Sequence, residues 1–580
     1  MRRLLTAAAI LFAAVSCGRG PKDGIHSLKL LTTNDVHGTW FDSLYTGGET
    51  RRSLFAAAWY IDSVRTSVGK DNVLLVDAGD CLQGDNATYY FNYVDTLSPH
   101  LFPRLAAYMG YDAIAVGNHD VETGHPVYDR VAAQLAAAGI PFLGGNAVRT
   151  DNGKPYFPLY KTFRRAGLKV LVLGYTNPNI KAWLGETIWE GMDFKSLLPL
   201  VQEDVDRLTA KEKPQVVIVV MHSGTGKGDG SSLESQGLDL YQSLHGVDVL
   251  VCSHDHRPFT KERDHLILIN SGSHSRNVGY GEITVETKHG KVVSKQLHAG
   301  LIPIDKDKAD PVMREHFRPE FEAVRDFTVK PIGKLSSELV FKEAVKGPTP
   351  YLALIHKVCL GCEPAQISIA APLNVRNSVA AGTLLYDDMF KIYPYENQLY
   401  IVQLTGAQIK GFLEESYDNW VYAPGEGDGH VLKIVSRGDA RYGYTSWSFT
   451  GATYNFDSAA GINYTVDVTK GKGERVCISS MADGSAFDPA ATYNVAMTSY
   501  RASGGGDLLS LGAGVDSSAI DSITVRKYPA IRDLIYDYVV RHGTVDTEAL
   551  MADKSLGSWS FEPAAEIAGA IEQDFNLVFR

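Results

Sequence analysis

Carboxylate, imidazole and amide side chains follow five apolar runs in the first half of the sequence. Each run is predicted to be a buried strand, and an α/β domain presents polar groups at the carboxyl ends of its parallel strands. The run at 113–116, for example, stops at Gly117-Asn118-His119-Asp120. The groups delivered in this way are Asp35 and His37, then Asp80, then Asn118 and His119, then His222, and finally His254 and His256.

These side chains are of the types that bind divalent metals. Imidazole with carboxylate suits zinc, iron, manganese and similar ions such as cobalt. Asp35 and His37 are two positions apart, so on a strand end both point to the same side; His254 and His256 have the same spacing. Eight groups are too many for one ion. We therefore expect two ions that share a carboxylate, an arrangement that clamps the attacking and leaving oxygens of a phosphoryl displacement.

The elements that position these groups divide the chain into two domains, as 580 residues require. Strands alternate with helices over 28–301, which predicts a layered α/β domain. Residues 302–345 are predicted to connect the domains, because 305–330 is strongly charged with helical spacing. Residues 346–551 are rich in tyrosine, glycine and short alternating runs, so we expect an α+β domain there. Residues 552–580 are predicted to be a C-terminal extension.

The N-terminal segment 1–16 has the pattern of a bacterial lipoprotein signal. Met1-Arg2-Arg3 is basic, 4–15 is apolar but too short to be a stable membrane anchor, and Ala14-Val15-Ser16 precedes Cys17. Cleavage before Cys17 would leave a lipid on that cysteine and a tether at 17–27, so we expect the protein outside the cytoplasm, held to a bacterial membrane by this anchor. The alternative is a plain secretory peptide with an incidental cysteine.

The net charge of −11 argues against a nucleic-acid polymer as partner, because proteins that bind nucleic acids usually carry basic patches. A small anionic substrate remains possible for an acidic protein, since a bound metal reverses the local field.

The five strand-end motifs, in this order and spacing, resemble those of the calcineurin-like metallophosphoesterases. The segment 33–38, Thr-Asn-Asp-Val-His-Gly, resembles the opening motif of the secreted bacterial 5′-nucleotidases and their cyclic-phosphodiesterase relatives. The resemblance spans nearly the whole mature chain. It implies a four-layer α/β metallophosphoesterase domain followed by a separate α+β substrate-binding domain.

The resemblance also implies a role for each strand-end residue. One ion would take Asp35, His37, Asp80 and His256, and the other would take Asp80, Asn118, His222 and His254, with Asp80 bridging. His119 would assist at the phosphoryl group rather than bind metal. Glu122 would orient His119, at a position where the family usually has aspartate.

The second domain would hold the nucleotide. Arg376 is a candidate phosphate contact, since guanidinium suits phosphate oxygens; the alternative is an ordinary surface arginine. Two aromatic segments, 453–457 and 498–507, match the places where the family stacks a base between rings. Tyr500 and Phe456 are the expected rings, with Tyr454 as a competitor, and both Phe456 and Tyr454 could instead be core residues. Asn397 and Asp507 complete the expected substrate contacts.

Three functions fit these expectations. The favoured one is a 2′,3′-cyclic-nucleotide 2′-phosphodiesterase/3′-nucleotidase, because Ala-Ala-Pro at 370–372 and Tyr-Pro-Tyr at 393–395 are similar to that branch. The second is a 5′-nucleotidase or nucleotide-sugar hydrolase. The third is a nucleotide-binding lipoprotein without catalysis.

Overall fold

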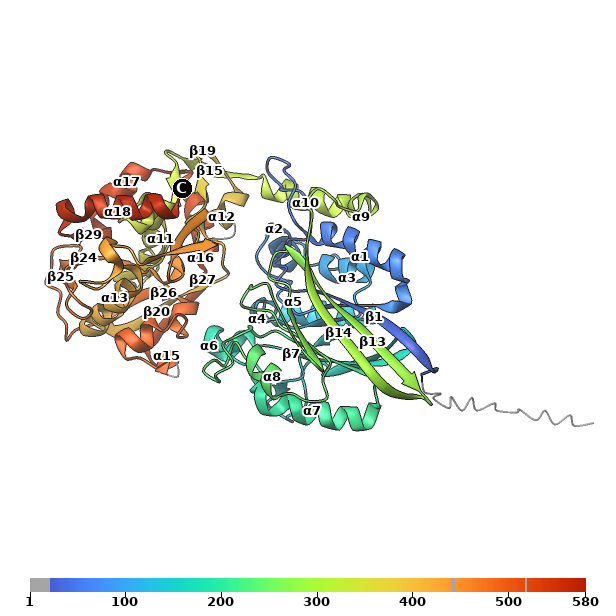
Figure 1. Ribbon diagram of the computed structural model, residues 1–580. Helices are drawn as coiled ribbons and strands as arrows, with labels where there is room; N and C mark the ends of the chain where they lie inside the picture. The colour runs from blue at the N-terminus through green and yellow to red at the C-terminus, as the bar shows by residue number, and fades with distance from the viewer. Residues whose placement is uncertain (1–20, 440–443, 517–518) are drawn as a thin grey trace, which may run out of the picture.

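The computed structural model describes residues 21–439, 444–516 and 519–580 as two domains joined by a helical connection (Figure 1). The first domain contains two six-stranded sheets, ordered β14-β13-β1-β2-β3-β4 and β11-β12-β10-β9-β7-β6. The strands of the first are β1 (Gly24–Thr33), β2 (Val73–Asp77), β3 (Ala113–Ala115), β4 (Phe142–Leu143), β13 (Asn277–Lys288) and β14 (Lys291–Pro303). Those of the second are β6 (Tyr160–Arg165), β7 (Leu168–Tyr175), β9 (Val216–Met221), β10 (Val249–Val251), β11 (Phe259–Arg263) and β12 (Leu266–Asn270).

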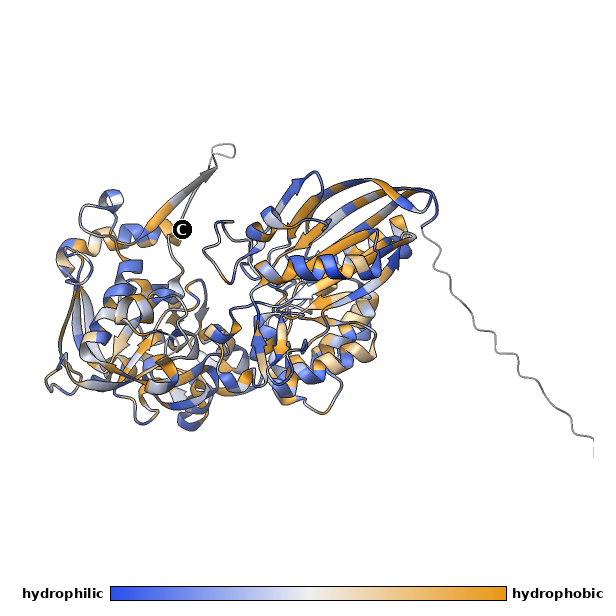
Figure 2. Cartoon of the chain, turned by 90° about the horizontal axis from the view of Figure 1, so that it is seen from below, coloured by the Kyte–Doolittle hydropathy of each residue, from blue (hydrophilic) through white to orange (hydrophobic). Residues whose placement is uncertain are grey.

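The two sheets stack face to face because their central strands are apolar on both faces. In β9, for example, Val216, Ile218 and Val220 pack between the sheets. The alternate residues of the same strand point outward to the helices that cover the second sheet. The central strands are fully buried apolar runs, and hydrophobic colouring is prominent on strands of this domain in Figure 2.

Helices cover the outer face of each sheet and complete four layers. The first sheet is covered by α1 (Leu54–Val68), α3 (Leu101–Met109) and α5 (His125–Ala137), and the second by α7 (Leu197–Glu212) and α8 (Gly237–Ser243). The helix starts follow local sequence: the hydroxyl of Ser53 accepts a hydrogen bond from the backbone N–H of Ala56 and caps α1. This is the predicted helix–sheet–sheet–helix architecture.

The connection consists of α9 (Pro311–His316) and α10 (Arg318–Thr328). Met313 of α9, Val324 of α10 and Phe317 between the two helices are buried in the same apolar cluster as α1. The connection is therefore packed on the first domain along part of its length.

The second domain is α+β, with a mixed five-stranded sheet at its centre. Its order is β23-β17-β26-β20-β27. These strands are β17 (Ile367–Ala370), β20 (Gln398–Thr405), β23 (Ser458–Ala460), β26 (Thr492–Thr498) and β27 (Thr524–Ala530). The faces of this sheet contribute to two apolar clusters, one containing α13 (Gly406–Trp420) and the other containing α11 (Pro350–Leu360) and α16 (Ile531–His542).

The prediction of a separate extension at 552–580 is wrong, because this segment is part of the second domain. β29 (Gly557–Glu562) pairs in parallel with β24 (Ile462–Asp467). α18 (Ala564–Val578) buries Ile567, Ile571 and Phe575 in the cluster around α13. The N-terminal boundary also differs, since β1 begins at Gly24, inside the predicted tether.

The predicted signal segment and Cys17 lie outside the described residues. Within the described part of the chain, no helix combines the length and apolar character needed to cross a membrane.

The domains touch through the segment that follows Asp80. α2 (Asn86–Tyr89) carries Asn86, whose amide donates to Asp387 Oδ1 at 2.7 Å, and Tyr89, whose hydroxyl donates to Asp533 Oδ1 at 3.1 Å. The Arg532 guanidinium lies 5.2 Å from the centre of the Tyr89 ring. The second domain thus rests on a segment only a few residues beyond Asp80.

Candidate active site and metal centre

The polar strand ends of both sheets meet at one edge of the first domain. β1, β2 and β3 run parallel in one sheet, as do β9 and β10 in the other, so their carboxyl ends lie on the same side. The segments that directly follow these five strands carry all seven predicted metal ligands, and Asn118 is the first residue of the short helix α4 (Asn118–Glu122). Two clusters result, one of Asp35, His37 and His256 and one of Asp80, His222 and His254, and in each cluster the ligand atoms lie within 4.8 Å of one another.

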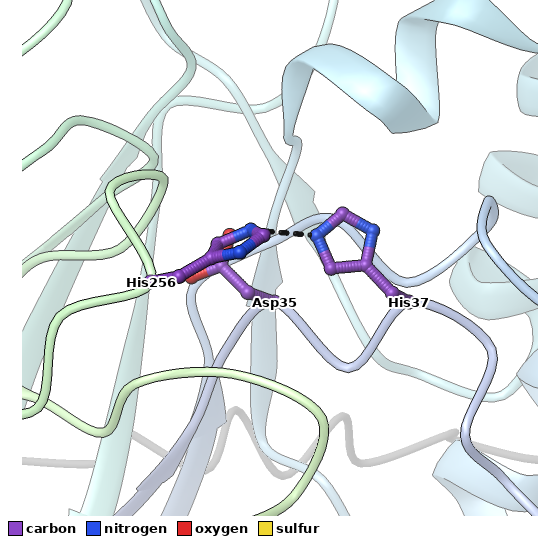
Figure 3. Close-up of side chains that lie close together, drawn as sticks. All are labelled: Asp35, His37 and His256. Carbon is purple, nitrogen blue, oxygen red and sulfur yellow. Dashed lines mark hydrogen bonds and ion pairs between the residues drawn. The ribbon is translucent and has the colours of Figure 1, made fainter. Parts of the chain in front are cut away.

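In the first cluster, two imidazoles and a carboxylate face a common point (Figure 3). His37 Nε2 lies 2.9 Å from His256 Nε2, and His256 Nε2 lies 3.6 Å from Asp35 Oδ1. Two ring nitrogens that face each other at this distance suit a shared cation, because neutral imidazole nitrogens bind metals through their lone pairs.

The second cluster is joined by Asn118. Its Oδ1 lies 3.0 Å from His222 Nε2 and 3.0 Å from His254 Nδ1. Asp80 Oδ2 is 3.1 Å from His222 Nε2 and 3.9 Å from His37 Nε2 of the other cluster. This carboxylate oxygen therefore faces both clusters, as a bridging ligand would.

Contacts outside the clusters hold the ligands in ligating orientations. His222 Nδ1 lies 2.8 Å from the carbonyl oxygen of Ala78, so a proton on Nδ1 leaves Nε2 free to ligate. Asp35 accepts hydrogen bonds from the Asn34 amide at 2.6 Å and from the backbone N–H of His254 at 3.0 Å. The donor set and its supporting contacts fit two divalent cations.

Five of the seven ligands have a left-handed backbone. The φ angles are 48° at Asp35, 48° at His37, 61° at Asp80, 71° at His254 and 55° at His256. Residues other than glycine seldom adopt this conformation, and such residues cluster at functional sites. The surrounding fold therefore imposes the ligand geometry on the loops.

Asp120 has a role that the sequence did not reveal. Its carboxylate accepts hydrogen bonds from four backbone N–H groups, those of Gly117 at 2.8 Å, Asp80 at 3.0 Å, Cys81 at 2.8 Å and Leu82 at 2.9 Å. This buried carboxylate fixes the loop after β2 against the loop after β3. It thereby sets the position of Asp80 relative to Asn118.

Gly117 lies where these two loops are closest. A Cβ at this position would overlap the carboxylate and backbone nitrogen of Asp80. We expect Gly117→Ala to displace Asp80, to lower the free energy of unfolding by about 1–3 kcal/mol as overpacking does, and to reduce metal content. Calorimetry and elemental analysis of the purified variant measure both effects.

Gly569→Ala is the matched control. Gly569 lies in α18 with nothing within 4 Å of an added Cβ, so alanine there is expected to stabilise the helix slightly. Full metal content with unchanged stability in Gly117→Ala would show that the close contact at Gly117 does not position Asp80.

His119 sits beside the clusters without joining either. Its ring Nδ1 lies 2.5 Å from Glu122 Oε2, and its backbone N–H donates to Asp80 Oδ1 at 2.8 Å. Burial lowers the pKa of His119, but the carboxylates of Glu122 and Asp80 outweigh burial and raise it to about 10. These carboxylates favour the protonated ring, which can donate a hydrogen bond from Nε2.

In the second domain, Tyr500 and Tyr454 lie close together and Phe456 does not join them. The Tyr454 and Tyr500 rings are perpendicular with centroids 6.3 Å apart, and Tyr454 is 38% exposed. Phe456 is fully buried and stacks on Trp420 at 5.2 Å. The prediction that Phe456 contacts a base is therefore corrected, and Tyr454 is the accessible ring of that segment.

Arg501 links the two aromatic segments and is a residue that sequence reasoning missed. Its buried guanidinium donates to Asp457 Oδ2 at 2.7 Å, to the carbonyl oxygen of Tyr454 at 2.7 Å and to that of Gly505 at 2.5 Å. The sequence shows an arginine directly after Tyr500, but it does not show that this arginine is buried, because its burial depends on the tertiary fold.

The remaining predicted contacts lie on the surface or near it. Arg376 is exposed in a turn after β17, and Asn397 is partly buried just before β20. Asp507 is exposed with a φ of 59°. Their roles stay predictions.

Comparison with known protein families agrees with this arrangement. Residues 28–258 match the family model described as calcineurin-like phosphoesterase, and residues 331–511 match that described as 5′-nucleotidase, C-terminal domain. The chain belongs to the 5′-nucleotidase family. As a family member it is a metal-dependent nucleotide phosphoesterase, and the two clusters are the candidate divalent-metal site.

Curated relatives of this family align with most of the chain at low identity. The 2′,3′-cyclic-nucleotide 2′-phosphodiesterase/3′-nucleotidase of Haemophilus influenzae is 24% identical, over 92% of this chain and 87% of the relative. The 5′-nucleotidase of Vibrio cholerae is 25% identical, over 77% and 89%. The trifunctional nucleotide phosphoesterase YfkN of Bacillus subtilis is 24% identical over 93% of this chain, which spans only 39% of that longer protein.

Two solved structures share the fold over most of the chain. A Staphylococcus aureus protein crystallised with alpha-ketoglutarate has a TM-score of 0.75 at 20% identity, covering 92% of this chain and 99% of that one. The 5′-nucleotidase precursor of Thermus thermophilus has a TM-score of 0.60 at 20% identity, covering 93% and 100%.

Proposed function

We propose that this family member hydrolyses 2′,3′-cyclic nucleotides and 3′-nucleotides. The observation that supports the hydrolytic chemistry is the pair of ligand clusters that Asp80 faces, with His119 next to the ligand Asn118 in α4. The choice of ester rests on the Ala-Ala-Pro segment at 370–372 and the Tyr-Pro-Tyr segment at 393–395, together with the similarity to the Haemophilus influenzae protein. The similar match to the Vibrio cholerae protein makes 5′-nucleotide hydrolysis the second candidate.

Each group of the chain has a part in the proposed reaction. Two divalent cations, when bound, would lower the pKa of a water molecule and neutralise the phosphoryl oxygens. Asp80 would keep them together. The protonated His119 ring would donate a hydrogen bond to a phosphoryl oxygen as charge develops there. Tyr500 and Tyr454 would hold the base.

A substrate panel tests this proposal. The purified protein, loaded in turn with Mn²⁺, Co²⁺ or Zn²⁺, is assayed with 2′,3′-cyclic AMP, 3′-AMP, 5′-AMP and a nucleotide sugar. We expect release from the first two. Turnover of 5′-AMP alone would favour the second candidate, and no turnover by metal-loaded protein would refute both.

Tyr500→Ala tests the base contact. Because stacking of a base on an aromatic ring contributes about 1–3 kcal/mol, we expect KM to rise roughly 5- to 150-fold with kcat little changed. Phe456→Ala should instead destabilise the core, by about 3–5 kcal/mol. Steady-state kinetics and thermal unfolding of both variants separate these effects, and an unchanged KM in Tyr500→Ala would remove this residue from the site.

We also propose that a lipid on Cys17 holds the protein to a bacterial membrane outside the cytoplasm. The support is the sequence pattern of residues 1–17. We expect the wild-type protein to partition into detergent and Cys17→Ser to remain aqueous or uncleaved. Aqueous partitioning of the processed wild type would favour a plain secretory peptide.

A further inference from the structure

Glu234 lies in the loop after β9, twelve residues beyond the ligand His222. Its carbonyl oxygen accepts three hydrogen bonds, from the backbone N–H of Gly224 at 3.0 Å, the hydroxyl of Ser223 at 2.9 Å and the amide of Asn177 at 3.1 Å. The backbone of this residue is therefore held firmly to the strand ends. Its side chain, by contrast, is 45% exposed.

The carboxylate of Glu234 borders the second ligand cluster without belonging to it. Glu234 Oε2 lies 3.8 Å from His254 Nε2, on the side of that ring opposite to the nitrogen that faces Asn118. The indole of Trp183 stacks on the same ring with centroids 5.2 Å apart. Glu234 therefore lies beside the second cluster, and its partly exposed carboxylate can accept hydrogen bonds from a bound substrate.

The charge of Glu234 also acts on two tyrosines of the second domain. Burial chiefly raises the pKa of both Tyr454 and Tyr500, and the negative charge of Glu234 adds to the increase at each. The carboxylate is therefore within electrostatic reach of both rings. Its side chain therefore lies 3.8 Å from a ligand of the second cluster and carries a charge that acts on both tyrosines.

We propose that Glu234 is a specificity-determining residue that accepts hydrogen bonds from the sugar hydroxyls of the substrate. The proposal rests on the proposed function, which places a phosphate at the metal centre and a base at the tyrosines. The sugar of any nucleotide lies between its phosphate and its base, which is the space that Glu234 borders. Carboxylates recognise ribose hydroxyls in other nucleotide sites by the same chemistry.

A different role for Glu234 would be to orient His254, since carboxylates often accept the second N–H of a metal-ligating histidine. The two roles differ in their dependence on the sugar. A sugar contact affects only substrates that have the hydroxyl, whereas a loss of ligand orientation affects every substrate and the metal content.

The test compares Glu234→Gln with wild type on matched substrates. The pairs are 3′-AMP with 2′-deoxy-3′-AMP, and 5′-AMP with 2′,3′-dideoxy-5′-AMP. Because a hydrogen bond to a charged group contributes more than one between neutral groups, we expect Glu234→Gln to lower kcat/KM by about 10- to 100-fold. This fall should appear for the hydroxyl-bearing member of the pair that the enzyme hydrolyses. The deoxygenated member should be unaffected, and metal content should stay at the wild-type level.

Glu186→Gln is the control, because it removes one exposed carboxylate three residues after Trp183 and should change neither member of a pair. An equal fall for both members, or a loss of metal, would overturn the proposal in favour of His254 orientation. Inactivity of metal-loaded wild type on all nucleotides would instead refute the proposed function. Calorimetric binding of adenosine and 2′,3′-dideoxyadenosine then examines the sugar contact without catalysis, and equal affinities would refute it as well.

Discussion

Replacing Asp80 by asparagine is expected to remove metal and hydrolytic activity together. One oxygen of this carboxylate faces histidines from both clusters, and the other accepts the backbone N–H of His119. Asparagine has nearly the same shape and tolerates the left-handed backbone at this position, so the change isolates the lost charge. Since two-metal chemistry supplies several kcal/mol of transition-state stabilisation, kcat/KM should fall at least about 10³-fold.

Elemental analysis after gel filtration, alongside the phosphate-release assay, measures both effects. Asp62→Asn is a suitable control because Asp62 is an exposed carboxylate on α1, paired only with Arg65 of the same helix among the contacts that the structure describes. Retention of two ions per chain by Asp80→Asn would show that this carboxylate does not bridge them.

Replacing His119 by asparagine should give the opposite combination, with both ions retained and the rate reduced. The ring pairs with Glu122 rather than with a ligand cluster, and the backbone N–H that supports Asp80 remains in the variant. A positioned acid contributes about 10²- to 10⁴-fold to a rate, so we expect a fall in kcat within this range.

The same elemental analysis and initial-rate measurements apply to His119→Asn. His125→Asn provides a histidine control six residues away, where the ring contacts Asp129 on α5. If His119→Asn emptied a metal position, His119 would be a ligand and its proposed role would be incorrect.

The strand ends of the first domain could be recognised from the sequence because they are local features. An apolar run that ends in aspartate, asparagine or histidine indicates both the strand and the edge at which it delivers the side chain. The partners of Asp120 could not be recognised, because Cys81 and Leu82 are almost forty residues away in sequence. Only the close approach of two loops brings their N–H groups to one carboxylate.

The second domain shows where local pattern is insufficient. Phe456 and Tyr454 are two residues apart in an aromatic segment, and the sequence alone does not decide which of them faces outward. Packing against Trp420 decides it. The pairing of β29 with β24 is equally non-local, since nearly a hundred residues separate the two strands. For this reason the sequence alone suggests that residues 552–580 are a separate C-terminal extension.

The left-handed backbone at five ligand positions limits which amino acids could replace those ligands in an engineered metal site. Aspartate, asparagine and histidine are enriched among residues with positive φ, so the fold selects the same amino acids that the metal chemistry selects. A cysteine or glutamate introduced at Asp35, His37 or His256 would meet a backbone penalty of about 1–2 kcal/mol before any metal bound. Altering the metal preference of this enzyme should therefore be easier at Asn118 and His222, where φ is not positive.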